Sequence, residues 1–142
     1  MKKIMIMLMT ILLGSICLTS KISAATTFYP SSCELEIDGD NLKIVCDEAV
    51  FNKTGRFSYN LMVDATYDTT GRLMSGVRFN LNTGVTASSD ARELSFTIDT
   101  LNKANSNDII TAGEHDFKLD VTTYPGGVET TDVYELGKHE IK

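Results

Sequence analysis

The chain has 142 residues, with 19 acidic against 13 basic side chains and three cysteines. This length suffices for one domain with one core once an export segment is set aside. The acidic balance argues against nucleic acid as a partner and against binding to anionic lipid.

Residues 1–25 have the pattern of a secretory signal peptide. Two lysines form a charged start, an apolar run covers 4–13, and Ser23-Ala24-Ala25 offers small residues for cleavage. A membrane anchor is the first alternative, but the apolar run is too short to span a bilayer. A lipoprotein is the second, and Ile16 disfavours it because a small residue should precede the lipidated Cys17.

Cleavage leaves residues 26–142 as one domain. Removal of Cys17 and three lysines leaves two cysteines, and 10 basic against 19 acidic residues give a formal charge of −9. Two cysteines in an exported chain favour one structural disulfide in an oxidising compartment. We therefore expect an exported protein of the periplasm, cell surface, fimbrium or medium, with no membrane insertion after cleavage.

The stretch CELEIDGDNLKIVC predicts a two-stranded hairpin that is closed by its own disulfide. A two-residue turn at Gly39-Asp40 sets Cys33 opposite Cys46 at a non-hydrogen-bonded pair, where the backbones are close enough for a bridge. Glu36 and Lys43 face each other on the polar side. The expected inward set is Cys33, Leu35, Ile37, Leu42, Ile44 and Cys46.

Period-two alternation predicts the remaining strands. They span 57–67, 73–81, 92–99, 115–124 and 128–136. Ser75-Gly76 interrupts the second of these and indicates a bulge. The longest loop is expected at 100–114, and 137–142 is expected to be a polar tail.

Seven short strands with turn signals between them, and no helical periodicity after the signal, predict an all-β antiparallel sandwich. A small barrel is the alternative. Six aromatic residues are expected to lie in the core: Phe57, Tyr59, Tyr67, Phe79, Phe96 and Phe117.

The mature chain is poor in reactive groups. His115 follows Glu114 at the start of a strand and His139 lies in the predicted tail, and we interpret both histidines as exposed. The clusters at 38–41 and 105–108 could offer oxygens to calcium, but ordinary turn chemistry explains both. We predict no enzymatic role, no cofactor and no metal site.

Residues 108–121, DIITAGEHDFKLDV, resemble the closing strand of chaperone–usher fimbrial subunits, most of all the invasin-type subunits of afimbrial adhesins. In that family a glycine precedes the strand, and here Gly113 is followed by Phe117, Leu119 and Val121 in alternation. The resemblance implies a single immunoglobulin-like sandwich of about seven strands that lacks its last strand. A periplasmic chaperone, and then a neighbouring subunit, supplies that strand. The same four residues are therefore a candidate strand-pairing edge.

The chain departs from the family pattern because it continues through 128–142 and because Pro30 breaks the lead-in before the first cysteine. These departures predict a subunit that completes itself or lies at a tip. We expect a non-catalytic bacterial surface or fimbria-like subunit, active in cell adhesion and virulence. Its expected partners are a periplasmic chaperone and other surface subunits, and the host receptor is unknown. The alternative is a free secreted or periplasmic binding protein, such as a surface-coat protein or an enzyme inhibitor, and a hydrolase ranks third.

Overall fold

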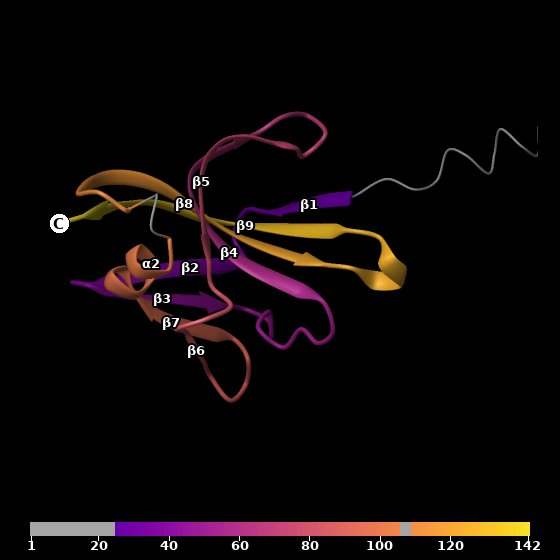
Figure 1. The fold of residues 1–142 in the computed structure, drawn as a ribbon, viewed down its shortest axis with the longest axis horizontal. Helices are drawn as coiled ribbons and strands as arrows, with labels where there is room; N and C mark the ends of the chain where they lie inside the picture. The colour runs from indigo at the N-terminus through magenta and orange to yellow at the C-terminus, as the bar shows by residue number, and fades with distance from the viewer. Residues whose placement is uncertain (1–24, 106–108) are drawn as a thin grey trace, which may run out of the picture.

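Two β-sheets pack face to face like a sandwich in a computed structural model that describes residues 25–105 and 109–142 (Figure 1). Sheet A has the strand order β1-β9-β8-β4-β5, and sheet B has the order β2-β3-β7-β6. The strands are β1 (Ala25–Tyr29), β2 (Cys33–Asp38), β3 (Asn41–Cys46), β4 (Phe57–Tyr67), β5 (Leu73–Asn80), β6 (Thr86–Ala87), β7 (Glu93–Thr97), β8 (Gly113–Thr123) and β9 (Thr130–Ile141). A helix, α2 (Ile98–Ala104), and a 3-10 turn, η1 (Pro125–Gly127), complete these elements. The mostly-β sandwich is confirmed, and the predicted signal lies outside the described residues apart from Ala25.

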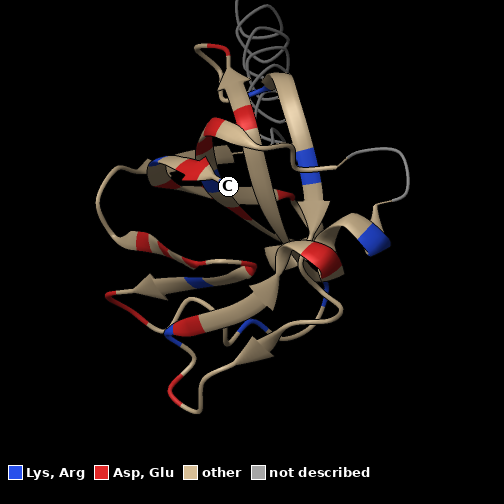
Figure 2. Ribbon diagram, turned by 90° about the vertical axis from the view of Figure 1, so that its left-hand side faces the viewer, with Lys and Arg blue, Asp and Glu red and all other residues tan. Residues whose placement is uncertain are grey.

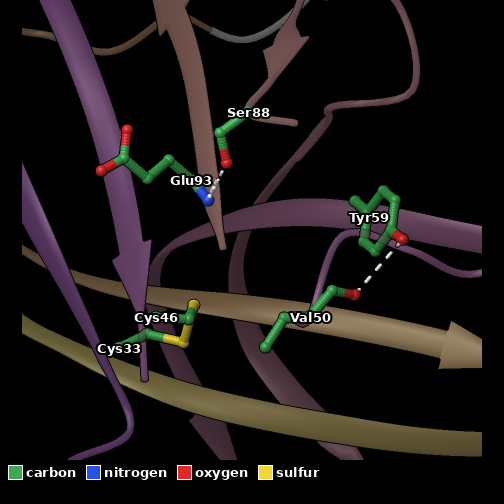
Figure 3. Close-up of a disulfide and its surroundings, with 6 residues drawn as sticks. All are labelled: Cys33, Cys46, Val50, Tyr59, Ser88 and Glu93. Atoms are coloured by element: carbon green, nitrogen blue, oxygen red, sulfur yellow. Dashed lines mark hydrogen bonds between the residues drawn. A yellow bond between two sulfur atoms is a disulfide. The ribbon is translucent and has the colours of Figure 1, made fainter. Parts of the chain in front are cut away.

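The disulfide hairpin forms as the sequence predicts. Cys33 is paired with Cys46 and bonded to it, and Glu36 is paired with Lys43 at 2.9 Å between Oε2 and Nζ. Gly39 adopts a φ of +59° in the turn, a conformation that glycine reaches without strain. Figure 3 shows the bridge beside Val50 and Tyr59, whose hydroxyl donates to the Val50 carbonyl. The disulfide therefore joins β2, an edge strand of sheet B, to its neighbour β3.

The core lies between the sheets and is built from the alternating inward residues of β4 and β8 together with their neighbours. Leu61, Phe79, Phe117 and Leu119 are fully buried. The pairing of β8 with both β4 and β9 fixes which residues point inward, because a one-residue slip would turn every side chain to the other face. The strands that the alternation predicted at 57–67 and 115–124 therefore form the centre of sheet A.

A helix occupies part of the chain where the sequence analysis placed strand and loop. The strand expected over 92–99 ends at Thr97, whose hydroxyl caps α2 by accepting from the Thr100 amide. Asp99 and Lys103 pair one turn apart at 2.6 Å, which supports the helix. Leu101 is the residue that anchors this helix in the core.

The C-terminal segment is a strand, so the expectation of a polar tail at 137–142 is wrong. β9 continues to Ile141, which is buried. A bulge at Gly137, with φ +81°, shifts the alternation by one residue. The inward-facing residues are therefore even-numbered up to Leu136 and odd-numbered after it, as at Ile141. This phase change explains why a simple period-two pattern ends before the strand does.

The lead-in forms a strand as well, and it runs parallel to β9 over five pairs, from Ala25↔Thr130 to Tyr29↔Tyr134. The Tyr29 and Tyr134 rings stack with centroids 4.7 Å apart. With the short β6, the described chain has nine strands rather than about seven, and one strand pair is parallel rather than antiparallel.

Candidate functional site

The β4–β5 hairpin folds back over the outer face of sheet A. In Figure 1 the loop between these strands rises from the sheet and bends toward β1, at the opposite edge. Thr26 of β1 donates a hydrogen bond to the Gly71 carbonyl at 3.3 Å, and the Phe28 ring meets the Tyr67 ring edge-on at 5.4 Å. The hairpin thus covers a face that the alternation predicts to be open to solvent.

Two glycines permit this closure. Gly71 has a φ of +82°, and a Cβ there would lie 2.5 Å from the Thr26 Cβ. Gly76 has a φ of +112°, and a Cβ there would lie 2.5 Å from the Ala65 Cα. An irregularity is found where Ser75-Gly76 predicted a bulge, but its first register shift sets Asp64 and Ala65 opposite Gly76, so the extra residue lies on β4. It turns Tyr67 to the outer face, so Tyr67 is not the core residue that the sequence predicted.

The hairpin tip is held by one carboxylate. Asp68 Oδ1 accepts from the Thr70 amide at 2.8 Å, from the Thr70 hydroxyl at 2.7 Å and from the Arg72 amide at 3.0 Å. These bonds lower the pKa of Asp68, the Thr70 hydroxyl being the largest cause. The tip is therefore an ordered loop with fixed contacts to β1.

A pocket of about 430 Å³ lies between this hairpin and the sheet. Asp120 of β8 is at its floor and is only 3 % exposed. Tyr67 and Arg78 belong to the hairpin side of the pocket, and Thr131 of β9 and Glu129 belong to the opposite side. The pocket thus combines a buried carboxylate, a guanidinium and several hydroxyl groups.

Burial dominates the electrostatics of the floor. It raises the pKa of Asp120, while a hydrogen bond from the Thr122 hydroxyl at 2.9 Å and the charge of Arg78 act in the opposite direction. Thr122 also shares a hydrogen bond with the Thr131 hydroxyl at 3.1 Å. The carboxylate therefore lies in a polar network whose hydrogen bonds and nearby charge only partly offset its desolvation.

Tyr67 contributes a second costly polar group. Its hydroxyl is buried and has no hydrogen-bond partner among the described residues. Burial, followed by the charge of Asp120, raises the pKa of Tyr67 to about 12, so the phenol stays protonated. An unpaired buried hydroxyl of this kind calls for a functional or structural explanation.

We expect Asp120→Asn to raise the melting temperature at neutral pH. The folded-state pKa of Asp120 lies above its unfolded value, so the charge opposes folding once the pH exceeds that unfolded value. The amide removes the charge and still accepts from Thr122. The gain should vanish at about pH 3, where the acid is protonated in both states.

The matched control is Asp116→Asn on the same strand. Asp116 pairs with the Lys118 ammonium, which is 8 % exposed, so removal of this charge should lower the melting temperature. Thermal unfolding followed by circular dichroism tests whether the melting temperature rises in Asp120→Asn and falls in Asp116→Asn. A loss of stability in Asp120→Asn at neutral pH would show that the Asp120 charge stabilises the fold.

A larger pocket of about 710 Å³ lies at sheet B, lined by residues of β2, β3, β6 and β7. Its charged pair, Lys43 and Glu36, is solvent-exposed, and exposed pairs contribute little to stability because water and salt screen them. This pocket lacks the buried carboxylate that Asp120 supplies on sheet A. We therefore take the pocket beneath the β4–β5 hairpin as the candidate site.

The candidate strand-pairing residues all lie in β8. Gly113, Phe117, Leu119 and Val121 are paired with β9, and the last three are also paired with β4. β8 is thus an interior strand, and the edges of sheet A are β1 and β5. The position beside β8 that a donor strand would use is occupied by β9.

His115 bonds to Asp64 rather than acting with Glu114. Its Nδ1 lies 2.7 Å from Asp64 Oδ2, and its Nε2 lies 2.9 Å from the Thr111 carbonyl. Two acceptors facing both ring nitrogens favour the doubly protonated ring. The hydrogen bond with Asp64 is the main cause that raises the pKa of His115, and the same bond lowers the pKa of Asp64.

This pair predicts a pH window of stability. The contribution of His115 is present below its ordinary pKa and is lost as the pH rises through its raised folded pKa. The contribution of Asp64 is lost as the pH falls through its lowered folded pKa. Because the Asp64 side chain is 55 % exposed, the pair should stabilise the fold by at most about 1 kcal/mol.

Urea unfolding of the wild type and His115→Gln tests this window. The difference between them should be largest at about pH 5.5 and small at about pH 8.5. His139→Gln is the control, since His139 Nε2 bonds to a neutral group, the Leu136 carbonyl, at 2.8 Å. An equal difference at both pH values would exclude the charged pair as its source.

The acidic clusters at 38–41 and 105–108 have structural roles where they are described. Asp38 pairs with Asn41 across the hairpin turn, and Asn105 donates to the Leu101 carbonyl at the end of α2. Residues 106–108 lie outside the described part. Figure 2 shows acidic positions spread over many elements. In 25–105 and 109–142, no three His, Cys, Asp or Glu side chains are grouped to hold a metal ion.

Comparisons of the chain with protein-family models, curated proteins and solved structures give no match. Within the described residues, no helix is both long enough and apolar enough to cross a membrane.

The sequence analysis missed the pocket because its residues look like an ordinary solvated strand face. Asp120 alternates with Leu119 and Val121, as an exposed polar residue would. The one usable signal was Ser75-Gly76, which marked the bulge but not the direction in which the hairpin bends. Long-range contact between Gly71 and Thr26 leaves no local pattern.

Proposed function

We propose that the chain is a non-catalytic, exported bacterial binding domain of the cell surface, a fimbria-like adhesive subunit that completes its own sandwich. The observation that carries this proposal is the antiparallel pairing of β9 with β8, from Gly113↔Ile141 to Thr123↔Thr130. A subunit that awaits a donor leaves an apolar groove beside this strand. Here Leu136 and Ile141 of β9 are buried in that position.

The strand order supports an immunoglobulin-like topology. In that topology, strands A, B, E and D share one sheet, and G, F, C and C′ share the other. The strands β2 to β9 can be named A, B, C, C′, D, E, F and G in chain order. Sheet B, β2-β3-β7-β6, then reads A-B-E-D, and the four antiparallel strands of sheet A, β9-β8-β4-β5, read G-F-C-C′. The disulfide differs from that of antibody domains, because Cys33 and Cys46 join neighbours in one sheet.

Three of the four sheet edges support a tip-type subunit rather than a shaft subunit, since a shaft subunit must exchange strands at both ends; the fourth edge, β5, has eight residues and does not contribute to this argument. β6 has two residues and β1 has five. β2 presents the acidic side chains Glu34, Glu36 and Asp38. Short and charged edge strands discourage the addition of another chain.

A free secreted or periplasmic binding protein is the second candidate, because the pairing of β9 with β8 favours it equally. Cell fractionation with a tag after Lys142 separates the two. A surface subunit should sediment with the cells and be released by shearing as a large assembly. Recovery of the monomer alone from periplasm or medium would favour the free protein.

Production of residues 26–142 alone in a periplasm tests self-completion. The expected product is a monodisperse monomer with one cooperative unfolding transition. Aggregation that is relieved only by a co-expressed fimbrial chaperone would contradict the proposal, since such a chaperone acts by lending a strand.

A further inference from the structure

We infer that the pocket beneath the β4–β5 hairpin binds a neutral polyhydroxylated ligand, a saccharide unit, which Asp120 and Arg78 orient. This inference rests on the proposed non-catalytic binding role and names the ligand class for it. The pocket volume of about 430 Å³ falls within the range of small-molecule sites.

The polar groups of the pocket match a ligand made of hydroxyl groups. Asp120 accepts hydrogen bonds, Arg78 donates them, and the threonine hydroxyls do both. Thr26, Thr70 and Thr131 all line the pocket. A ligand hydroxyl likewise donates and accepts, so it can donate to the carboxylate while it accepts from the guanidinium.

The charges of the pocket indicate that this ligand is neutral. Arg72 and Arg78 are balanced by Asp120 and Glu129 among the lining residues. Arg78 and Asp120 both line the pocket and form no ion pair within 4.0 Å, so neither charge is taken up by direct contact with the other and both are left to bond to a ligand. A cationic ligand would be repelled by the two arginines, and an anionic ligand by the two carboxylates.

The pocket also retains polar groups that the fold alone does not need. Asp120 is nearly fully buried, and the buried Tyr67 hydroxyl has no hydrogen-bond partner in the part of the chain that the structure describes. Binding surfaces commonly keep such features at the expense of stability. The fixed hairpin tip and its contact between Gly71 and Thr26 give the pocket a formed wall, which lowers the ordering cost of binding.

Titration of residues 26–142 with neutral sugars, followed by amide chemical shifts in NMR, tests this inference. The probes are galactose, mannose, glucose, N-acetylglucosamine and lactose at millimolar concentration. At least one should shift the amides of Tyr67, Gly71, Arg78 and Asp120. Arg78→Gln and Asp120→Asn should each weaken that binding roughly tenfold or more, because each removes a charge-assisted hydrogen bond.

Lys43→Gln, in the pocket at sheet B, is the matched control and should leave the affinity unchanged. Absence of shifts at the pocket with all five sugars, in a spectrum that shows a folded monomer, would overturn the ligand class. That result would leave the proposed self-complete domain standing, since the same spectrum reports folding. Pocket shifts with glycine or acetate instead of the sugars would also overturn it, in favour of a charged ligand.

Discussion

Removal of residues 128–142 is expected to abolish the cooperative unfolding of the domain. The deletion removes β9, which buries Val133, Tyr134, Leu136 and Ile141. Each such side chain contributes about 1.5–3 kcal/mol, so together they match the whole stability of a typical domain. The deletion also leaves one side of β8 unpaired and removes the strand with which β1 pairs. Size-exclusion chromatography and urea unfolding should therefore show an aggregated chain without a sharp transition.

Removal of Lys142 alone is the control for this deletion, because Lys142 is exposed and lies beyond the end of β9. It should leave both measurements unchanged. A synthetic peptide of residues 128–142, added during refolding, should restore the monomeric size by replacing the missing strand. A truncated chain that stays monomeric and unfolds cooperatively would show that β9 is dispensable.

Replacement of both Cys33 and Cys46 by alanine is expected to lower the free energy of unfolding by roughly 2–5 kcal/mol. The bridge spans 13 positions of sequence, and both cysteines are buried in the core between the sheets. The loss therefore combines a freer unfolded chain with smaller side chains in the core. Chemical denaturation of the double variant gives the number directly.

Glu36→Gln is the matched variant in the same hairpin. It breaks the exposed ion pair with Lys43, so the expected loss of stability is small and clearly less than that of the double cysteine variant. An equal loss of unfolding free energy in the two variants would mean that the disulfide contributes no more to stability than the exposed ion pair. Mass mapping of the wild type should also recover Cys33 and Cys46 in one linked peptide.

Local patterns predicted the parts of the fold that are fixed by local geometry. The hairpin from Cys33 to Cys46 has its register, faces and bridge set by a two-residue turn. β4 has the bounds that its eleven-residue alternation predicted, 57–67. In the disulfide hairpin one buried face forbids a slip of register, so the sequence carries the answer within a short window. β4 is buried on both faces around Leu61 and Met62, so its bounds but not its covered outer face follow from the alternation.

The misses have three physical causes. Alternation continues from Leu94 and Phe96 to Ile98, so it hid the start of α2, although Thr97 supplied a capping hydroxyl. Gly137 changes the phase of β9, so its end resembled a tail. The pocket depends on a hairpin that reaches from one edge of sheet A to the other, and contacts between such distant segments leave no periodic signal.

Native-state amide hydrogen exchange of residues 26–142 tests most directly the claim that the chain completes its own sandwich. The amides of β9 that face β8 are predicted to open only with the whole domain, with the same protection as those of β4. Such protection would show that β9 is an integral strand of sheet A. Rapid exchange along β9, while β4 and β8 remain protected, would contradict the account and leave β8 available to a donor strand.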